Sequence, residues 1–170
     1  NDCSDGVFLT TRAGTNTYDF IFKESFVRPG IGAANWTTRN NYPALGLVQT
    51  GPDEMSIYVQ RHYAQMTSHL ERMTMRLDGF ASLNADYNGG EMVTRPIIFD
   101  GSELEINYST SAAGSVRIEI QDQYGNVLPR YSIENSIEMI GDEIKKIAVW
   151  QSESDLSNLA GIPIRLRFVM

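Results

Sequence analysis

Residues 42–77 place the strongest constraint on the fold, because they predict three consecutive β-strands joined by short turns. The strands are expected over residues 43–50, 54–63 and 69–77. In the middle strand a polar set alternates with Met55, Ile57, Val59, Arg61 and Tyr63, and alternate residues of a strand point to opposite faces of a sheet. The polar set is Glu54, Ser56, Tyr58, Gln60 and His62. This segment therefore predicts an up-and-down antiparallel meander, as in one blade of a β-propeller.

The polar face of that strand has two interpretations. A carboxylate, a hydroxyl, a phenol, an amide and an imidazole on one face would suit a polyhydroxylated ligand. Asn35, Trp36 and Arg39 lie just upstream, in a connection over residues 28–41 whose length is typical of functional loops. The alternative is a solvated outer face with unrelated polar side chains, and the alternation fits both.

From residue 78 onward the pattern changes to shorter strands separated by regular turn signals, which predicts a β-sandwich of the jelly-roll type. Val116, Ile118 and Ile120 are expected on the buried face and the residues between them in water. Residues 154–159 predict a helical turn capped by Ser154. The predicted fold class is all-β, with closing strands of a propeller in residues 1–77 and a C-terminal sandwich in residues 78–170.

Composition argues against several classes of function. The chain has 21 acidic and 14 basic residues and no basic run, so no nucleic-acid partner is expected. No segment approaches the roughly 20 apolar residues that span a bilayer, so no membrane partner is expected. Cys3 is the only cysteine, which leaves neither an internal disulfide nor a cysteine zinc site.

No cofactor is predicted, although a structural calcium ion has possible oxygen ligands near the turns of the second half. These are Glu91, Glu103, Glu105, Asp122 and Asp142, and they lack EF-hand spacing.

Short segments spread over the whole chain resemble the C-terminal half of bacterial glycosyl-hydrolase-like proteins related to the invertase, levanase and arabinanase clan. In the first half these segments are residues 8–12 (FLTTR), 26–30 (FVRPG), 35–36 (NW), 54–59 (EMSIYV), 62–63 (HY) and 77–80 (LDGF). In the second half they are residues 89–91 (GGE), 110–115 (TSAAGS), 141–142 (GD) and 154–161 (SDLSNLAG).

This resemblance implies a five-bladed β-propeller followed by a β-sandwich, an oligo- or polysaccharide substrate, and an extracellular or periplasmic location. It also implies that the remaining propeller blades lie upstream or on another chain. The clan's Asn-Asp-Pro-like nucleophile, Arg-Asp-Pro and Glu-Cys motifs do not occur here, and Asp2-Cys3 lacks the glutamate. The resemblance therefore implies that this chain is part of a glycoside hydrolase and is inactive by itself.

Glu54 is the candidate catalytic carboxylate, because it opens the polar-faced strand. A general acid at this position would need burial or a second carboxylate to raise its pKa. His62 lies eight residues further along, about 26 Å away in a flat strand. Glu54 and His62 therefore cannot contact the same substrate atom.

The candidate substrate-binding residues are Asn35, Trp36, Arg39, Tyr58 and His62. Trp36 offers a flat apolar face for a sugar ring, and Tyr58 can donate to sugar hydroxyls. Arg39 can bind a carboxylate of substrate or protein. Core packing of Trp36 and a simple ion pair of Arg39 are the alternatives.

Two other functions remain open for the second half. Residues 78–170 could form a non-catalytic carbohydrate-binding module, in which Tyr87, Tyr108 and Tyr131 are expected to be exposed. They could also form a scaffold that only supports the propeller, and the absence of an aromatic platform in the sequence favours this scaffold over sugar binding.

Overall fold

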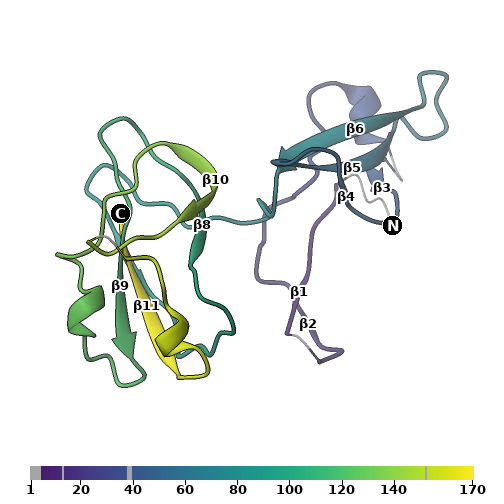
Figure 1. Ribbon diagram of the computed structural model, residues 1–170. Helices are drawn as coiled ribbons and strands as arrows, with labels where there is room; N and C mark the ends of the chain where they lie inside the picture. Colours follow the sequence, from purple (N-terminus) through teal and green to yellow (C-terminus); the bar gives the residue numbers. More distant parts are fainter. Residues whose placement is uncertain (1–4, 13, 38–39, 152) are drawn as a thin grey trace. The chain divides into compact units, whose positions relative to one another are not determined.

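The computed structural model describes residues 5–12, 14–37, 40–151 and 153–170. The chain divides into two compact units, Asn1–Asp78 and Gly79–Met170. Both units are built from antiparallel strands with three short 3-10 helices, so the protein is all-β (Figure 1). Among the described residues no sheet closes on itself, and no helix has the length and apolar character needed to cross a bilayer.

The first unit is organised around one long hairpin. Strand β5 (Glu54–Arg61) pairs along its whole length with β6 (His69–Arg76), while β3 (Tyr42–Pro43) and β4 (Val48–Gln49) pair with opposite ends of β5. A separate small hairpin joins β1 (Thr10–Thr11) to β2 (Tyr18–Asp19). The 3-10 helix η1 (Ala33–Trp36) lies in the loop before β3.

Two expectations for this region need correction. The strand expected over residues 43–50 is split into β3 and β4, with Gly46 between them at φ +93°, a conformation outside the β region. The central strand ends at Arg61, because His62 has φ +51° and starts the turn to β6. His62 is therefore a turn residue.

The second unit contains two antiparallel sheets. In one, β11 (Ile164–Val169) lies between β7 (Glu91–Val93) and β9 (Arg117–Asp122). In the other, β8 (Glu105–Ser109) pairs with β10 (Asp142–Ile147). Two further 3-10 helices, η2 (Pro129–Tyr131) and η3 (Ser157–Leu159), lie in the connections.

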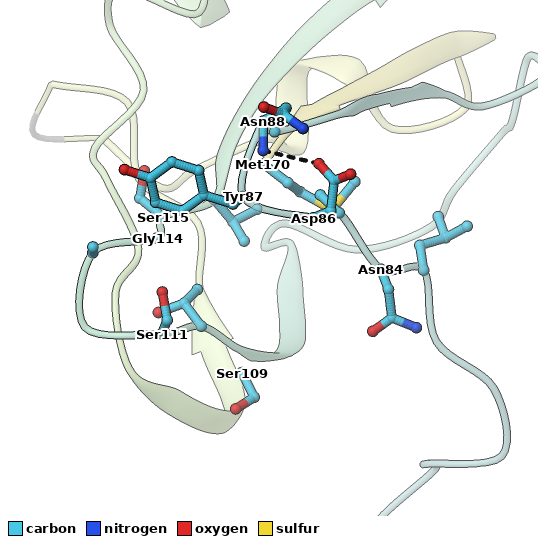
Figure 2. Close-up of a pocket in the computed structure, with 15 residues that line it drawn as sticks. Asn84, Asp86, Tyr87, Asn88, Ser109, Ser111, Gly114, Ser115 and Met170 are labelled. Carbon is cyan, nitrogen blue, oxygen red and sulfur yellow. Dashed lines mark hydrogen bonds between the residues drawn. The ribbon is translucent and has the colours of Figure 1, made fainter.

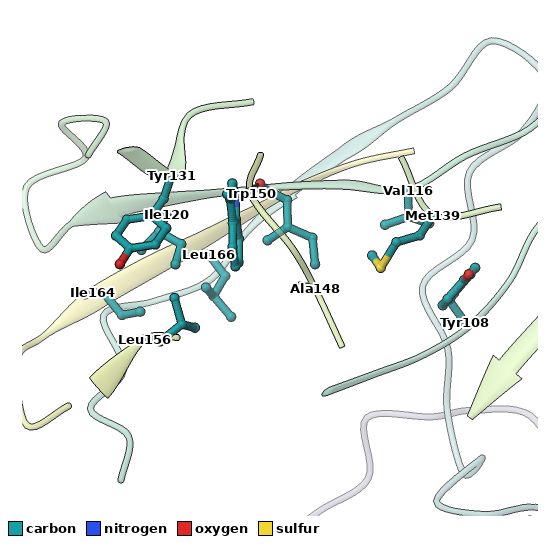
Figure 3. Packing of buried hydrophobic residues seen from close by; sticks show 11 residues of the cluster. Tyr108, Val116, Ile120, Tyr131, Met139, Ala148, Trp150, Leu156, Ile164 and Leu166 are labelled. Atoms are coloured by element: carbon teal, nitrogen blue, oxygen red, sulfur yellow. Dashed lines mark hydrogen bonds between the residues drawn. The ribbon is translucent and has the colours of Figure 1, made fainter. Parts of the chain in front are cut away.

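Both sheets of the second unit contribute to one hydrophobic core. Its buried members are Tyr108, Val116, Ile118, Ile120, Tyr131, Met139, Ala148, Trp150, Leu156, Ile164 and Leu166 (Figure 3). In the described part of the first unit, by contrast, the buried apolar side chains are Val27 and Val59. The two units thus differ sharply in how much apolar surface each buries internally.

The alternation expected in residues 116–121 is only half correct. Val116, Ile118 and Ile120 are buried as predicted, but Glu119 on the other face is also buried, at 3% exposure. It is covered because Arg167 from the neighbouring strand β11 and the backbone N–H of Ile133 both donate to its carboxylate. A carboxylate can be buried when it is paired and hydrogen-bonded in this way.

The short helix near the end of the chain also differs from the prediction. It spans Ser157–Leu159, and Leu156 occupies the N-cap position expected for Ser154. The carboxylate of Asp155 instead accepts a hydrogen bond from the Ser157 N–H at 2.8 Å. An Asx-type turn therefore orders this segment.

The hydrogen bonds of the Asp122 turn predict that acid weakens the second unit. Hydrogen bonds from the side chain and backbone of Asn126, with smaller contributions from Tyr124 and Gly125, lower the pKa of Asp122. The pKa values of Glu134, Glu138 and Asp155 are lowered as well. A carboxylate with a lowered folded-state pKa stabilises the protein above its unfolded pKa, about 3.9 for Asp, and the stabilisation disappears as pH falls through the folded value.

We therefore expect Asp122→Asn to be less stable than the wild type at pH 7 and to approach it at pH 3. The amide cannot supply the charged acceptor that the turn uses at neutral pH, and acid removes this acceptor from the wild type too. Urea unfolding followed by circular dichroism at both pH values measures the difference. If the free energies of unfolding of Asp122→Asn and the wild type differed by the same amount at pH 3 and at pH 7, this explanation would be wrong.

Candidate functional site

Glu54 lies in a hydrogen-bonded cluster at the start of β5. It forms an ion pair with Arg72 of β6 and accepts a hydrogen bond from the Thr50 hydroxyl at 2.7 Å. Arg72 also donates to the Ser56 hydroxyl at 2.9 Å. Ser56 is fully buried, so the cluster fastens β4, β5 and β6 together.

This environment differs from that of a general acid. Such a carboxyl holds its proton because it is buried or lies beside a second carboxylate, whereas the Glu54 side chain is 40% exposed and faces a guanidinium. The geometry therefore favours a structural role for Glu54. Its catalytic role stays a prediction.

Asn35 and His62, 27 residues apart in sequence, are joined by a direct hydrogen bond of 2.9 Å between Asn35 Oδ1 and His62 Nε2. Asn35 Nδ2 donates to the Ile31 carbonyl at 2.7 Å, so its Oδ1 is the acceptor and His62 Nε2 carries the hydrogen. The second ring nitrogen of His62 lies 2.9 Å from the Thr67 hydroxyl. Two of the predicted binding residues thus share a site, and both ring nitrogens of His62 already have partners.

Trp36 follows Asn35 in η1 and leaves 63% of its surface in solvent. Its indole N–H donates to the Gly30 carbonyl at 2.9 Å, which fixes the ring on the loop. Asn40, 2% exposed, supports the same loop by donating to the Asn35 carbonyl at 2.7 Å. Such exposure is compatible with stacking on a sugar ring, and the sugar-binding role of Trp36 stays a prediction.

Tyr58 lies in the middle of β5, opposite Arg72, and is half-buried. Arg39 is outside the described residues. Glu54 opens β5, Tyr58 lies midway, and His62 with its partner Asn35 lies beyond the other end, so the described candidates are spread along the strand. The structure does not bring them into one centre.

A groove in the second unit was not predicted from the sequence. It has a volume of about 640 Å³ and lies between residues 83–89 and 109–116, with Met170 also in its wall (Figure 2). Sites for small ligands typically measure about 300–1,000 Å³. Its size is therefore that of a small-ligand site.

The first wall of the groove is a tight turn that presents Tyr87. The Asp86 carboxylate accepts a hydrogen bond from the Asn88 N–H at 2.8 Å, and the Asp86 carbonyl accepts one from the Gly89 N–H at 2.9 Å. This Asx turn holds Tyr87 at its outer corner, where the side chain is fully exposed. The backbones of Gly90 and Met170 then exchange two hydrogen bonds of 2.9 and 2.8 Å, which anchor the turn to the end of β11.

The polar side chains of the groove fall into two groups. Thr110 is bonded to the Gly141 backbone, and Ser115 donates to Glu138 at 3.2 Å. Within the described part of the chain, the side chains of Asn88, Ser109 and Ser111 make no hydrogen bond. These three retain their full capacity to bind a ligand.

Two of the three tyrosines expected to be exposed are buried, which corrects that prediction. Tyr108 and Tyr131 belong to the core, at 8% and 5% exposure, and their hydroxyls donate to the carbonyls of Ile140 and Asp155. Burial, followed by the charge of Glu143, raises the pKa of Tyr108. The sequence signal that separates Tyr87 from them is the Asp-Tyr-Asn-Gly-Gly turn around it, because a turn projects its corner residue into solvent.

The possible calcium ligands are dispersed. Glu91 pairs with Arg167, and both carboxylate oxygens of Asp122 accept hydrogen bonds from its own turn. Among the residues that the structure describes, no group of three or more His, Cys, Asp or Glu side chains could hold a metal ion.

Fold and groove together describe an all-β protein whose second unit has an open groove lined by both polar and apolar residues. No family model matches the chain, and no match was found among the curated proteins or the solved structures.

The close approach of Gly89 to Met170 gives a prediction for the groove wall. Gly89 has φ +78°, and a Cβ added there would lie 2.8 Å from the Met170 carbonyl oxygen; Gly161 has φ +77° with nothing within 4 Å. We expect Gly161→Ala to cost about 1–2 kcal/mol of unfolding free energy, from backbone conformation alone. Gly89→Ala should cost more, because the backbone must also move.

Urea unfolding of the two glycine variants gives this comparison directly. Because their φ values match, the difference between them isolates the close contact. Equal losses of unfolding free energy in the two variants would mean that the turn moves away from Met170 without lowering the stability.

Proposed function

We propose that this chain is a carbohydrate-binding portion of a carbohydrate-active protein of the glycoside hydrolase class, and that it holds glycan without cleaving it. The observation that supports this function is the groove of the second unit, where an exposed tyrosine lies beside uncharged hydroxyl and amide groups. Sugars present hydroxyls and apolar ring faces, and these groups are complementary to both.

The environments of Glu54 and Asp86 support binding over cleavage. Glycosidases of the common type place two carboxyl groups about 5–10 Å apart across the scissile bond. Glu54 is paired with Arg72, and Asp86, which lines the groove, is engaged in its own turn. The nucleophile and acid of the parent enzyme would then lie on other segments, upstream or on another chain.

The architecture proposed with this function is that of the resemblance. The β3–β6 meander would supply closing strands of a β-propeller, and the two sheets around the shared core would form the sandwich. The small number of buried apolar side chains in the first unit supports a need for further strands against it. In this proposal the protein acts outside the cytoplasm, on an oligo- or polysaccharide.

A purely supporting role for the second unit is the other candidate. The observation in its favour is the extensive core, which would give a rigid body whether or not the groove binds a ligand. The two functions differ in one measurable property, the binding of glycan.

Affinity electrophoresis of the full chain in gels that contain soluble polysaccharides tests the proposal. We expect retardation by at least one polysaccharide and no release of reducing ends, and we expect Glu54→Gln to change neither. Failure to bind any polysaccharide would leave the supporting role. Hydrolysis that is lost in Glu54→Gln would restore Glu54 as a catalytic residue.

A further inference from the structure

We propose that the groove of the second unit selects neutral glycans over acidic ones, with Tyr87 as the stacking platform and Asn88, Ser109 and Ser111 as the groups that bind hydroxyls. This inference rests on the proposed carbohydrate-binding function. It adds the position of the site and the chemical class of the ligand.

The first argument is the position of Tyr87. The Asx turn of Asp86 and the two backbone hydrogen bonds between Gly90 and Met170 fix the backbone on both sides of it. The ring is fully exposed, and it lines the same groove as Gly114 and Ser115 of the opposite wall (Figure 2). An exposed aromatic ring on an ordered turn at a groove provides the flat apolar surface on which the face of a sugar ring packs.

The second argument is the hydrogen-bonding capacity around that ring. Asn88 follows Tyr87 directly, whereas Ser109 and Ser111 come from the opposite wall and lie below it in Figure 2. An amide and two hydroxyls supply both donors and acceptors, which is what a sugar hydroxyl requires, since it donates and accepts at once. The described structure uses none of these three side chains internally.

The third argument is charge. No Lys or Arg is among the residues that line the described groove, and its charged member is the carboxylate of Asp86. The whole chain carries a formal net charge of −7 at pH 7. A uronic acid, a sulfated sugar or a phosphate would meet no cation there and would be repelled by this carboxylate, because like charges in contact are unfavourable.

Competition between neutral and acidic polysaccharides tests the proposal on the full chain. We expect retardation by one or more of dextran, inulin and laminarin, and none by alginate or polygalacturonate at the same concentration and ionic strength. Tyr87→Ala should weaken binding about tenfold, while Tyr87→Phe, which keeps the ring, should stay within about threefold of the wild type.

Tyr124→Ala is the matched control, because Tyr124 is 81% exposed in the same unit and lies outside the groove. Its binding should equal that of the wild type. Ser111→Ala is a second variant in the opposite wall and should also weaken binding, and circular dichroism verifies that each variant is folded.

The outcomes separate this inference from the proposed function. Retardation of Tyr87→Ala and Ser111→Ala equal to the wild type would overturn the groove as the site, while the carbohydrate-binding function would stand. Equal retardation by alginate and dextran would overturn the selection for neutral sugars. Absence of binding to all five polysaccharides would overturn both.

Discussion

Replacing Trp150 by alanine should lower the free energy of unfolding of the Gly79–Met170 unit by about 3–5 kcal/mol, the usual cost of removing a large buried aromatic side chain. Trp150 is 2% exposed and contacts Tyr131 edge-on, with ring centroids 5.4 Å apart. Its indole N–H donates to the Ile118 carbonyl at 2.7 Å, so the variant also leaves a buried acceptor on β9 unpaired. Urea unfolding followed by far-ultraviolet circular dichroism measures the loss.

Trp36→Ala serves as the control, because the chain has two tryptophans and Trp36 is 63% exposed. We expect it to cost less than about 1 kcal/mol. Trp150→Phe separates packing from hydrogen bonding, since it keeps a ring but loses the N–H. Similar losses for Trp36→Ala and Trp150→Ala would contradict the position of Trp150 in the core.

Replacing Arg167 by methionine should destabilise the same unit by about 3 kcal/mol. Arg167 bridges two carboxylates, Glu91 at 2.6 Å and Glu119 at 3.3 Å, and the Glu119 side chain is only 4% exposed. Arginine stays charged in proteins, and the hydrogen bonds that Arg167 donates to Glu91 are the largest cause that raises its pKa further. Without this cation, Glu119 would be a buried charge whose remaining donors are Gln121 and the Ile133 N–H.

Arg117→Met is the matched control for this ion pair. Arg117 lies on the adjacent strand β9 and pairs with Glu138, but both side chains are about 45% exposed. Surface pairs contribute about 0–1 kcal/mol, so the loss should be small. If Arg167→Met lowers the free energy of unfolding no more than Arg117→Met does, the ion pair between Arg167 and Glu119 contributes little to stability.

Alternation and turn signals predicted the all-β class and several of its strands. The β5–β6 hairpin and the buried row Val116, Ile118 and Ile120 follow from alternating side chains and from turn signals between strands. The burial of Glu119 could not follow from that pattern, because its cation comes from β11, 48 residues away in sequence. Alternation describes one strand and contains no information about the neighbouring strand.

The candidate site was less accessible to sequence reasoning. The contact between Asn35 and His62 depends on a loop and a turn whose conformations alternation does not describe, namely η1 and the left-handed backbone of His62. The groove likewise combines two turns and Met170. The turn sequence around Tyr87 indicates its exposure, but the burial of Tyr108 and Tyr131 depends on tertiary contacts that alternation does not describe.

The placement of the two tryptophans gives the protein a pair of built-in optical reporters, one in each unit. Trp36 is open to solvent, so it should emit at long wavelength and be quenched readily by iodide. Trp150 is enclosed, so it should emit at shorter wavelength and resist that quencher until its own unit unfolds. Single-tryptophan variants would therefore record the unfolding of each unit separately, without any added label.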